Sequence, residues 1–384
     1  MLGQSVHRGG GAGSWPGGAS VDSGVVSGSF AQRLLAELRA DIPLHLIVAA
    51  YAGAVFLVAQ TLGRPEKFEL LMYAERWIIV LPGLVLPGIA CIGVVCAVIT
   101  HPRAPFTGLV GFLCHPRGPR LAAGLVLFTS VTLFYGAFTS AKNLLPEVSH
   151  FDWDVALADL GEWMHGGTPL WRHLHPVLTP YTRYIDIFYN VFWQVAMLTM
   201  VLAMAFANQR RRRFFIIFFL CWIVLGNVLA GMFYSAGPIF YDRVVGDAQR
   251  FRFLLDYIGG YQDPPLAVSV YQSYLWTLHR LGAPEFGSGI SAFPSMHVSM
   301  ATLIALWLTR MHRRLAIPAV LMVLLTQAGS VHLGWHYAVD GYASIILTYL
   351  IWRMVDQAAS RQPVRRTAPP AALDGAMAPA GAGG

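Results

Sequence analysis

The chain has 384 residues, of which 55% are hydrophobic and only 12% are charged. A soluble domain carries about 25% charged residues, so this composition excludes a soluble enzyme and favours a membrane protein. The net charge of +7 would suit a nucleic acid, but the arginines cluster between apolar stretches, where basic residues set membrane orientation. We therefore expect a membrane and no nucleic acid among the partners.

Both ends of the chain are expected to be disordered tails. Residues 1–30 are rich in glycine and serine, and residues 356–384 are rich in alanine, proline, glycine and arginine. Such segments cannot bury enough apolar surface to offset the entropy lost on ordering. We assign residues 1–40 and 356–384 to tails, and we expect no cleaved signal peptide, because no compact apolar region with a cleavage site follows a basic start.

Between the tails the sequence predicts about eight membrane-spanning helices. Each is an apolar run close to the ~20 residues that cross a hydrocarbon layer of ~30 Å, and backbone groups in lipid must be paired within the segment, which helices achieve. The predicted spans are Leu44–Leu62, Trp77–Thr100, Leu121–Ser140, Tyr184–Ala207, Phe214–Phe233, Ile290–Leu308, Leu315–Val331 and Tyr337–Val355. The fold class is an all-α polytopic membrane bundle, with two helices over 41–120 in front of six over 121–355.

The arginines between the spans predict the orientation of the bundle. They are Arg103, Arg117 and Arg120 in the second loop, Arg210, Arg211, Arg212 and Arg213 in the fourth, and Arg310, Arg313 and Arg314 in the sixth. By the positive-inside rule these loops and both tails are cytoplasmic. The third, fifth and seventh loops then lie on the periplasmic or extracellular side of the inner (plasma) membrane.

The segment Gly287–His297 runs directly into the sixth predicted span. Its glycines and the small residues Ser291 and Ser295 allow backbone N–H groups to approach an anion, and the following helix start adds partial positive charge. His297 would lie in the first helical turn and could protonate an oxygen of a bound phosphate. An equally open interpretation is a helix-start histidine whose ring is satisfied by neighbouring hydroxyls.

A second polar string, Ser330–Asp340, leads into the last predicted span. His336 and Asp340 are four residues apart, which places them on one helix face. A carboxylate that binds one ring nitrogen fixes the imidazole tautomer and raises the basicity of the other nitrogen, as a nucleophilic histidine requires. A purely structural His–Asp pair that locks helix packing is the alternative.

Pro294–His297 reads P-S-M-H and His336–Asp340 reads H-Y-A-V-D. These strings lie on the same predicted side of the membrane, and they resemble the second and third signature motifs of the type-2 phosphatidic acid phosphatase superfamily. The resemblance covers about 121–355. It implies that His336 is a nucleophile that becomes phosphorylated, that Asp340 orients it, that His297 protonates the leaving group, and that no cofactor or metal is needed.

The sequence departs from that superfamily at two places. The family's first motif, K-x6-R-P, is expected after the fifth span, but Tyr234–Arg243 contains neither a lysine nor an R-P pair. Gly329–Ser330 stands where the third motif normally opens with Ser-Arg. These departures, with Lys142–Pro146 and Asp152–Gly167, are similar to the inositol phosphorylceramide synthase branch. That branch implies headgroup transfer between lipids, with a phospholipid or sphingolipid substrate, in place of plain hydrolysis.

A phosphate site still needs cations to offset its negative charge. Arg243 is the first candidate because it follows the fifth span, and Lys142 is the second. His332 lies one turn before His336 and could line the pocket, unless Gly334 breaks the helix between them. The remaining candidates for the pocket are Arg250, Arg252, Arg280, Tyr241 and Tyr337.

Two other functions are compatible with parts of the sequence. A protein that binds a metal or haem could use His297, His332, His336 and Asp340 as ligands. A transporter could line its pathway with the same polar residues, although transporter sites lie near the bilayer midplane, and here the polar clusters crowd one boundary. The third loop, with its mixed apolar and acidic run over 152–165, reads either as a surface-lying connector or as a lid over the substrate.

Overall fold

The computed structural model describes residues 29–80, 104, 117–207 and 210–360. All regular elements within these ranges are helical. Six of the helices are long and apolar enough to cross a membrane: Phe30–Thr61, Gly118–Val148, Leu170–Ala205, Arg211–Met232, Arg313–His332 and Ala338–Ser360. The described part of the chain is therefore an all-α bundle of membrane-spanning helices, as its composition predicts.

Helix α15, Met296–Met311, lies at the centre of the bundle. It packs against α9 (Trp193–Ala205), α10 (Arg210–Ile223), α16 (Ala316–His332) and α17 (Ala338–Ser360). Every side chain from Val298 to Ala305 is buried, as expected for a helix surrounded by others on all sides. With 16 residues it is shorter than the other spans. The loop before it enters the bundle and carries candidate site residues.

Helices α1 (Phe30–Thr61) and α5 (Arg117–Val148) lie side by side at one edge of the bundle. The short η1 (Pro65–Lys67) and α2 (Met72–Val80) follow α1 and pack on α5. The second predicted span begins within α2, and its continuation to Thr100 lies outside the described residues. Of the other seven predicted spans, six overlap helices that are long and apolar enough to cross a membrane. The remaining one corresponds to α15, which has 16 residues and begins at Met296 and not at Ile290.

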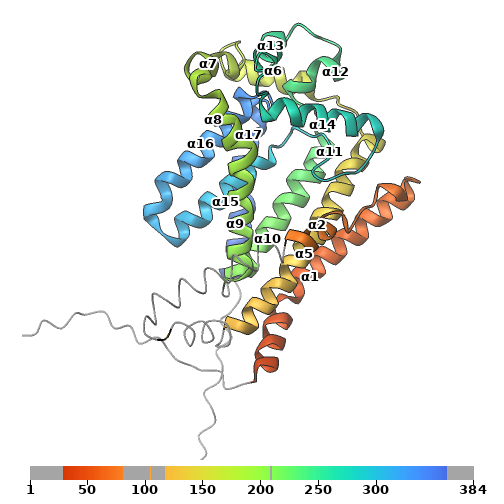
Figure 1. The fold of residues 1–384 in the computed structure, drawn as a ribbon, viewed down its shortest axis with the longest axis vertical. Helices are drawn as coiled ribbons and strands as arrows, with labels where there is room; N and C mark the ends of the chain where they lie inside the picture. The colour runs from red at the N-terminus through yellow and green to blue at the C-terminus, as the bar shows by residue number, and fades with distance from the viewer. Residues whose placement is uncertain (1–28, 81–103, 105–116, 208–209, 361–384) are drawn as a thin grey trace, which may run out of the picture.

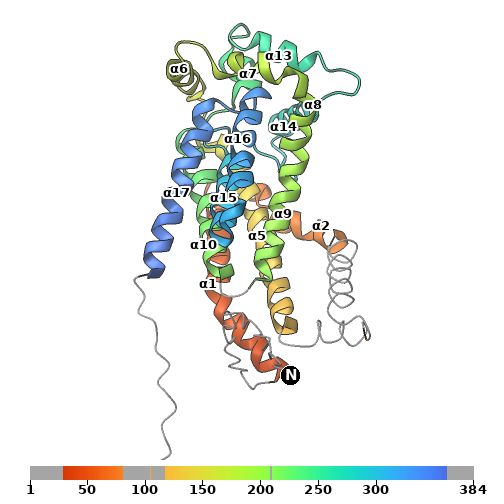
Figure 2. The ribbon, with the colours of Figure 1, turned by 90° about the vertical axis from the view of Figure 1, so that its left-hand side faces the viewer.

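A layer of short helices covers one end of the bundle (Figure 1, Figure 2). Its members are α6 (Asp154–Met164), α7 (Leu170–Leu178), η3 (Thr179–Tyr181), η6 (Pro238–Phe240), α12 (Tyr241–Val245), α13 (Arg252–Gly259) and α14 (Ala267–Leu281). The chain then enters the bundle through α8 (Thr182–Ile187) and η4 (Phe188–Phe192), and reaches this end again through η5 (Val224–Leu229) and α11 (Ala230–Met232). The name outer layer refers below to the helices α6, α7, η3, η6, α12, α13 and α14.

Several boundaries differ from the sequence predictions. Helix α1 begins at Phe30, inside the segment 1–40 assigned to a tail, because Ser29 and Gln32 form reciprocal capping hydrogen bonds of 3.3 and 3.0 Å that start the helix early. Helix α5 continues to Val148, which places Lys142 on a helix and not in a loop. The last helix runs to Ser360, beyond the predicted start of the second tail.

The start of α10, which carries Arg211, Arg212 and Arg213, lies at the end of the bundle opposite the outer layer (Figure 2). There Arg211, which is 1% exposed, binds Asp41 at 2.7 Å and Glu37 at 2.8 Å, and this cluster joins α10 to α1. Buried charges persist only where they are paired in this way. The two ends of the bundle therefore differ in chemistry, with basic loops at one end and the polar motif strings at the other.

Candidate functional site

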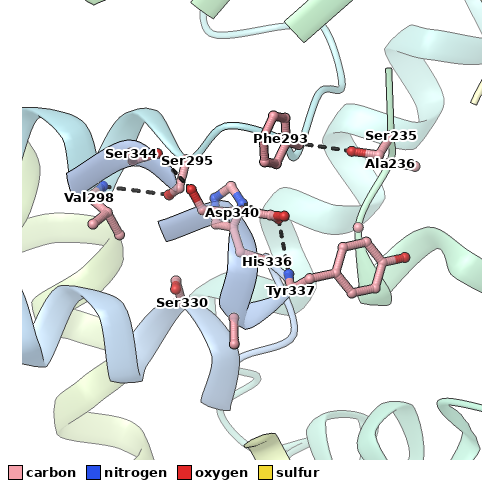
Figure 3. Close-up of polar contacts among 12 residues, drawn as sticks. Ser235, Ala236, Phe293, Ser295, Val298, Ser330, His336, Tyr337, Asp340 and Ser344 are labelled. Atoms are coloured by element: carbon pink, nitrogen blue, oxygen red, sulfur yellow. Dashed lines mark hydrogen bonds and ion pairs between the residues drawn. The ribbon is translucent and has the colours of Figure 1, made fainter. Parts of the chain in front are cut away.

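The segment before α15 forms the first wall of the site. Ser295 caps α15 by accepting a hydrogen bond from the backbone N–H of Val298, at 3.5 Å, and its own N–H donates to the carbonyl of Asp340 at 3.4 Å. The hydroxyl of Ser295 is fully buried, whereas Ser291 is half-buried in the loop. Ser295 therefore joins the start of α15 to the start of α17 (Figure 3).

The second wall is the turn between α16 and α17. Gly334 has a φ of +74°, which few residues other than glycine adopt, and it reverses the chain after His332. The N–H groups of Trp335 and His336 both donate to the carbonyl of Ser330, at 3.0 and 3.2 Å. This turn brings His336 to the head of α17, beside Asp340.

His336 and Asp340 form a hydrogen-bonded pair. Nδ1 of His336 lies 3.2 Å from Oδ2 of Asp340, which also accepts from the N–H of Tyr337 at 3.0 Å. Asp340 is fully buried and His336 is 8% exposed. With Nδ1–H donating to the carboxylate, the lone pair of Nε2 is free to attack an electrophile. This is the pairing that the four-residue spacing predicts.

His297 lies against two aromatic rings of the neighbouring helix. Its imidazole stacks on Tyr189, with ring centroids 4.5 Å apart, and on Trp193 at 4.0 Å. The indole N–H of Trp193 donates to the carbonyl of His297 at 3.0 Å. His336 and Lys142 are both near enough for their charges to act on His297, so the structure brings these three residues to one site.

Lys142 reaches this site from α5. The loop before α15 docks directly on it: a Cβ on Gly289 would lie 2.7 Å from the Cβ of Lys142, and Asn143 donates to Ser288 at 2.8 Å. Within the described part of the chain, the Lys142 ammonium has neither an acidic partner nor a hydrogen-bond acceptor. It is thus a half-buried cation beside the two histidines.

A model of the PAP2 superfamily matches residues 156–354. The chain belongs to the PAP2 superfamily. No curated protein and no solved structure matches the sequence. The matched segment contains His297, His336 and Asp340, and it begins after Lys142 and after the first residues of α6.

Two of the expected pocket residues lie apart from this PAP2 site. The guanidinium of Arg243 is exposed and lies 5.0 Å above the ring of Trp276. The ring of His332 turns toward α8, where its Nε2 lies 2.8 Å from the hydroxyl of Thr182. Helix α16 ends at His332 and Gly334 reverses the chain, so His332 and His336 do not share a helix face.

The outer layer holds the other candidate arginines. Arg250 binds Asp159 at 2.5 Å and Glu162 at 3.1 Å, both on α6, and donates to the hydroxyl of Tyr241 at 3.2 Å. Arg252 forms an exposed ion pair with Asp256, and Arg280 ends α14. Arg250 therefore fastens α6 to the rest of the layer, and its charge is already neutralised.

The outer layer also closes over His336. Residues of α6 and α7, among them Gly161, Glu162 and Trp171, surround a cavity of about 20 Å³ next to His336. That volume is close to the space of one water molecule. In the described residues, moreover, no three His, Cys, Asp or Glu side chains gather as a metal site would require.

One residue of the site has no counterpart among the sequence predictions. Asp154, the first residue of α6, is fully buried and accepts three hydrogen bonds, one of them from the hydroxyl of Tyr337. Burial raises the pKa of Asp154 to about 6, although the hydrogen bonds from Ala236, Tyr337 and Gly237 oppose the rise. The acidic run around it reads as a surface helix, so the sequence carries no signal that this one carboxylate is buried.

Proposed function

We propose that this PAP2 protein transfers a phosphoryl group from a lipid-linked phosphate through a phosphohistidine at His336. The observation that carries the proposal is the bond between Nδ1 of His336 and Oδ2 of Asp340, at 3.2 Å, with His297 in the same site. Nε2 attacks phosphorus while the bond from phosphorus to the leaving oxygen breaks, and His297 supplies the proton to that oxygen. An acceptor hydroxyl then attacks phosphorus and the N–P bond breaks. The proton of that hydroxyl passes to His297.

Lys142 supports a phosphate as the ligand of this site. A phosphoryl group in transfer spreads negative charge over its equatorial oxygens, and fixed cations and N–H groups stabilise that charge. Lys142 is the cation that the structure brings to His297 without an acidic partner. We therefore propose Lys142 in place of the cations of the missing first motif, with Ser291 and the Gly287–Gly289 backbone as further contacts.

The closed surroundings of His336 favour transfer to a lipid or polyol hydroxyl over hydrolysis. A phosphohistidine in contact with bulk water would be hydrolysed, and enclosure protects such an intermediate. His336 is 8% exposed, and residues of α6 and α7 lie between it and bulk water. We propose headgroup transfer between phospholipids or sphingolipids, like that of the inositol phosphorylceramide synthase branch, at the outer face of the inner membrane.

The first experiment compares His336→Ala and His297→Ala with wild type. Lipid mass spectrometry of expressing cells shows which headgroup class depends on His336, and turnover of that lipid is then measured with purified protein in detergent. We expect His336→Ala to lose all turnover and His297→Ala to lose about 10²–10⁴-fold. His312→Ala, an exposed histidine at the far end of α15, is the matched control.

The outcomes separate the possible functions. Full turnover in His336→Ala would disprove the phosphohistidine. Accumulation of a phosphorylated lipid in that variant would indicate a phosphatase, whereas a missing headgroup class would indicate a transferase. Stoichiometric zinc, iron or haem in the purified protein would instead support the metal-binding alternative.

A further inference from the structure

Asp154 is a buried carboxylate that holds two parts of the chain which are far from it in sequence. Its Oδ2 accepts from the N–H of Ala236 at 2.8 Å, and its Oδ1 accepts from the N–H of Gly237 at 2.8 Å and from the hydroxyl of Tyr337 at 2.7 Å. Both oxygens are therefore occupied. The two carboxylate oxygens therefore hold the loop at Ala236 and Gly237, and they hold Tyr337 in the turn that carries His336.

The loop that Asp154 holds, residues 235–237, contacts both motif strings (Figure 3). Ser235 accepts from the N–H of Ala292 at 2.8 Å through its carbonyl, and from the N–H of Phe293 at 3.2 Å through its hydroxyl. On the other side, a Cβ on Gly237 would lie 2.5 Å from the carbonyl oxygen of Trp335. This loop is thus wedged between the segment that carries His297 and the turn that carries His336.

Tyr337 connects the two buried carboxylates of the site. Its hydroxyl donates to Asp154 and its backbone N–H donates to Oδ2 of Asp340, the same oxygen that pairs with His336. Any movement of Tyr337 would therefore move the oxygen partner of the nucleophile. Tyr337 is 4% exposed, so bulk water has little access to its hydroxyl group.

An isolated buried carboxylate is costly, and neutral donors offset only part of that cost. No cation acts on Asp154 within the described residues, and burial raises its pKa to about 6. Perturbed carboxyls of this kind concentrate at functional sites. The three donors that Asp154 gathers all belong to segments that shape the site around His297 and His336, which argues for a role in the reaction and not only in packing.

We infer that Asp154 is a positioning residue for the phosphoryl transfer proposed above. It fixes the loop 235–237 and Tyr337, and through them it holds the segments that carry His297 and His336 in place relative to one another. The inference rests on the proposed function, because it assigns Asp154 to that reaction.

The test measures binding of orthovanadate, which adopts the five-coordinate geometry of a phosphoryl group in transfer and needs no knowledge of the donor lipid. Isothermal titration of the purified full chain in detergent gives the stoichiometry and the affinity separately. A merely structural role of Asp154 would lower the fraction of competent protein, and hence the stoichiometry. A positioning role lowers the affinity at unchanged stoichiometry.

We expect Asp154→Asn to weaken orthovanadate binding by about 10–100-fold, the usual effect of losing a partner that orients a ligand or catalytic group. Tyr337→Phe removes only one of the three hydrogen bonds and should weaken binding by about 5–20-fold. The double variant should be no weaker than Asp154→Asn, because both changes break the same connection. Asp152→Asn, an exposed carboxylate two residues away, should bind as wild type does.

The outcomes distinguish the two proposals. Wild-type affinity in Asp154→Asn, with binding abolished in His336→Ala, would overturn the role of Asp154 and leave the proposed function standing. If Asp154→Asn does not accumulate in the membrane, Tyr337→Phe decides alone, and wild-type affinity there overturns the inference. Wild-type binding in His336→Ala would overturn the proposed function, and the role of Asp154 with it.

Discussion

The chain has only two lysines, Lys67 and Lys142, and they differ in whether an acidic side chain is paired with them. Lys142 stands beside the histidines without an acidic partner, whereas Lys67 binds Glu147 at 2.6 Å and the carbonyl of Asn143 at 3.2 Å. Both are substantially buried near the same end of α5. Lys67 is therefore paired within the fold, whereas we propose that the charge of Lys142 serves a bound phosphate.

We predict that Lys142→Met raises the KM for the lipid phosphate, or the dissociation constant for orthovanadate, by about 10–100-fold. A hydrogen bond to a charged group contributes about 1.5–3 kcal/mol, which corresponds to that factor. Lys67→Met should leave the affinity unchanged and lower the thermal midpoint, because it leaves Glu147 with only Arg64. The reverse pattern would remove Lys142 from the phosphate site.

The carboxyl of Asp154 should make stability depend on pH in a defined direction. Because burial raises its pKa from 3.8 to about 6, the folded protein holds a proton between pH about 4 and about 6 that the unfolded chain has released. The free energy of unfolding therefore falls as the pH rises through this window, by at most about 3 kcal/mol. The groups that face the carboxyl are Tyr337, Tyr234, Asp340 and the N–H groups of Ala236 and Gly237.

The measurement is the thermal midpoint of wild type minus that of Asp154→Asn, in detergent, as a function of pH. The subtraction removes the titration of all other groups. We expect the difference to grow as the pH is lowered from about 6 to about 4 and to stay level below that. A difference that is independent of pH would show that burial does not raise the pKa of Asp154.

At the scale of elements, the loop 235–237 depends on a glycine. Gly237 has a φ of +91° and a Cβ there would lie 2.5 Å from the carbonyl oxygen of Trp335. Gly246, which ends α12, has a φ of +82° and open space around it. Alanine at either position carries the left-handed strain of about 1–2 kcal/mol, but only alanine at 237 must also displace the backbone beside His336.

We predict that Gly246→Ala retains turnover with a small loss of stability. Gly237→Ala should lose at least about tenfold in turnover, because a displacement of about 1 Å at a reacting group costs up to about 10²-fold. Turnover and thermal midpoint of the two variants, measured side by side, separate strain from displacement. Equal behaviour of the two variants would mean that the contact of Gly237 with Trp335 does not shape the site.

The elements themselves were largely predictable from the sequence, since long apolar runs determine membrane helices and their ends need only approximate placement. The start of α15 was less so: the predicted span begins at Ile290, but Ser295 caps the helix, which begins at Met296. Likewise, the hydrogen bonds of Ser29 with Gln32 extend α1 into the predicted tail.

The site was predictable only where its residues are close in sequence. His336 and Asp340 are separated by one helical turn, so their spacing reveals the pair. Asp154 binds residues that follow it by more than 80 and 180 positions, and such contacts arise from the tertiary fold and leave no local pattern. His332 is the opposite case: its four-residue spacing from His336 placed it in the pocket only if the helix continued, and the chain reverses at Gly334.

At the scale of the whole molecule, the chemical difference between the two ends of the bundle predicts which leaflet the site faces. Helices α15 and α16 run from the site to a connection that contains Arg310, Arg313 and Arg314. At the other end the outer layer covers the site, and the α13–α14 connection carries exposed Gln262 and Asp263. Basic connections remain in the cytoplasm, so the histidines should face headgroups of the outer leaflet.

We predict that a cysteine at Asp263 is labelled by a membrane-impermeant maleimide in intact cells, whereas a cysteine at His312 is labelled only after permeabilisation. Both positions are exposed, so differences in reactivity come from the membrane and not from burial. The background has its four native cysteines replaced by serine, and each variant must retain His336-dependent turnover to show that it is folded. Labelling in the opposite sense would place the site in the cytoplasm, where soluble phosphate esters compete with lipids. The donor and the acceptor would then have to be sought among inner-leaflet lipids and cytoplasmic phosphate esters, and the assignment of the site to the outer leaflet would be wrong.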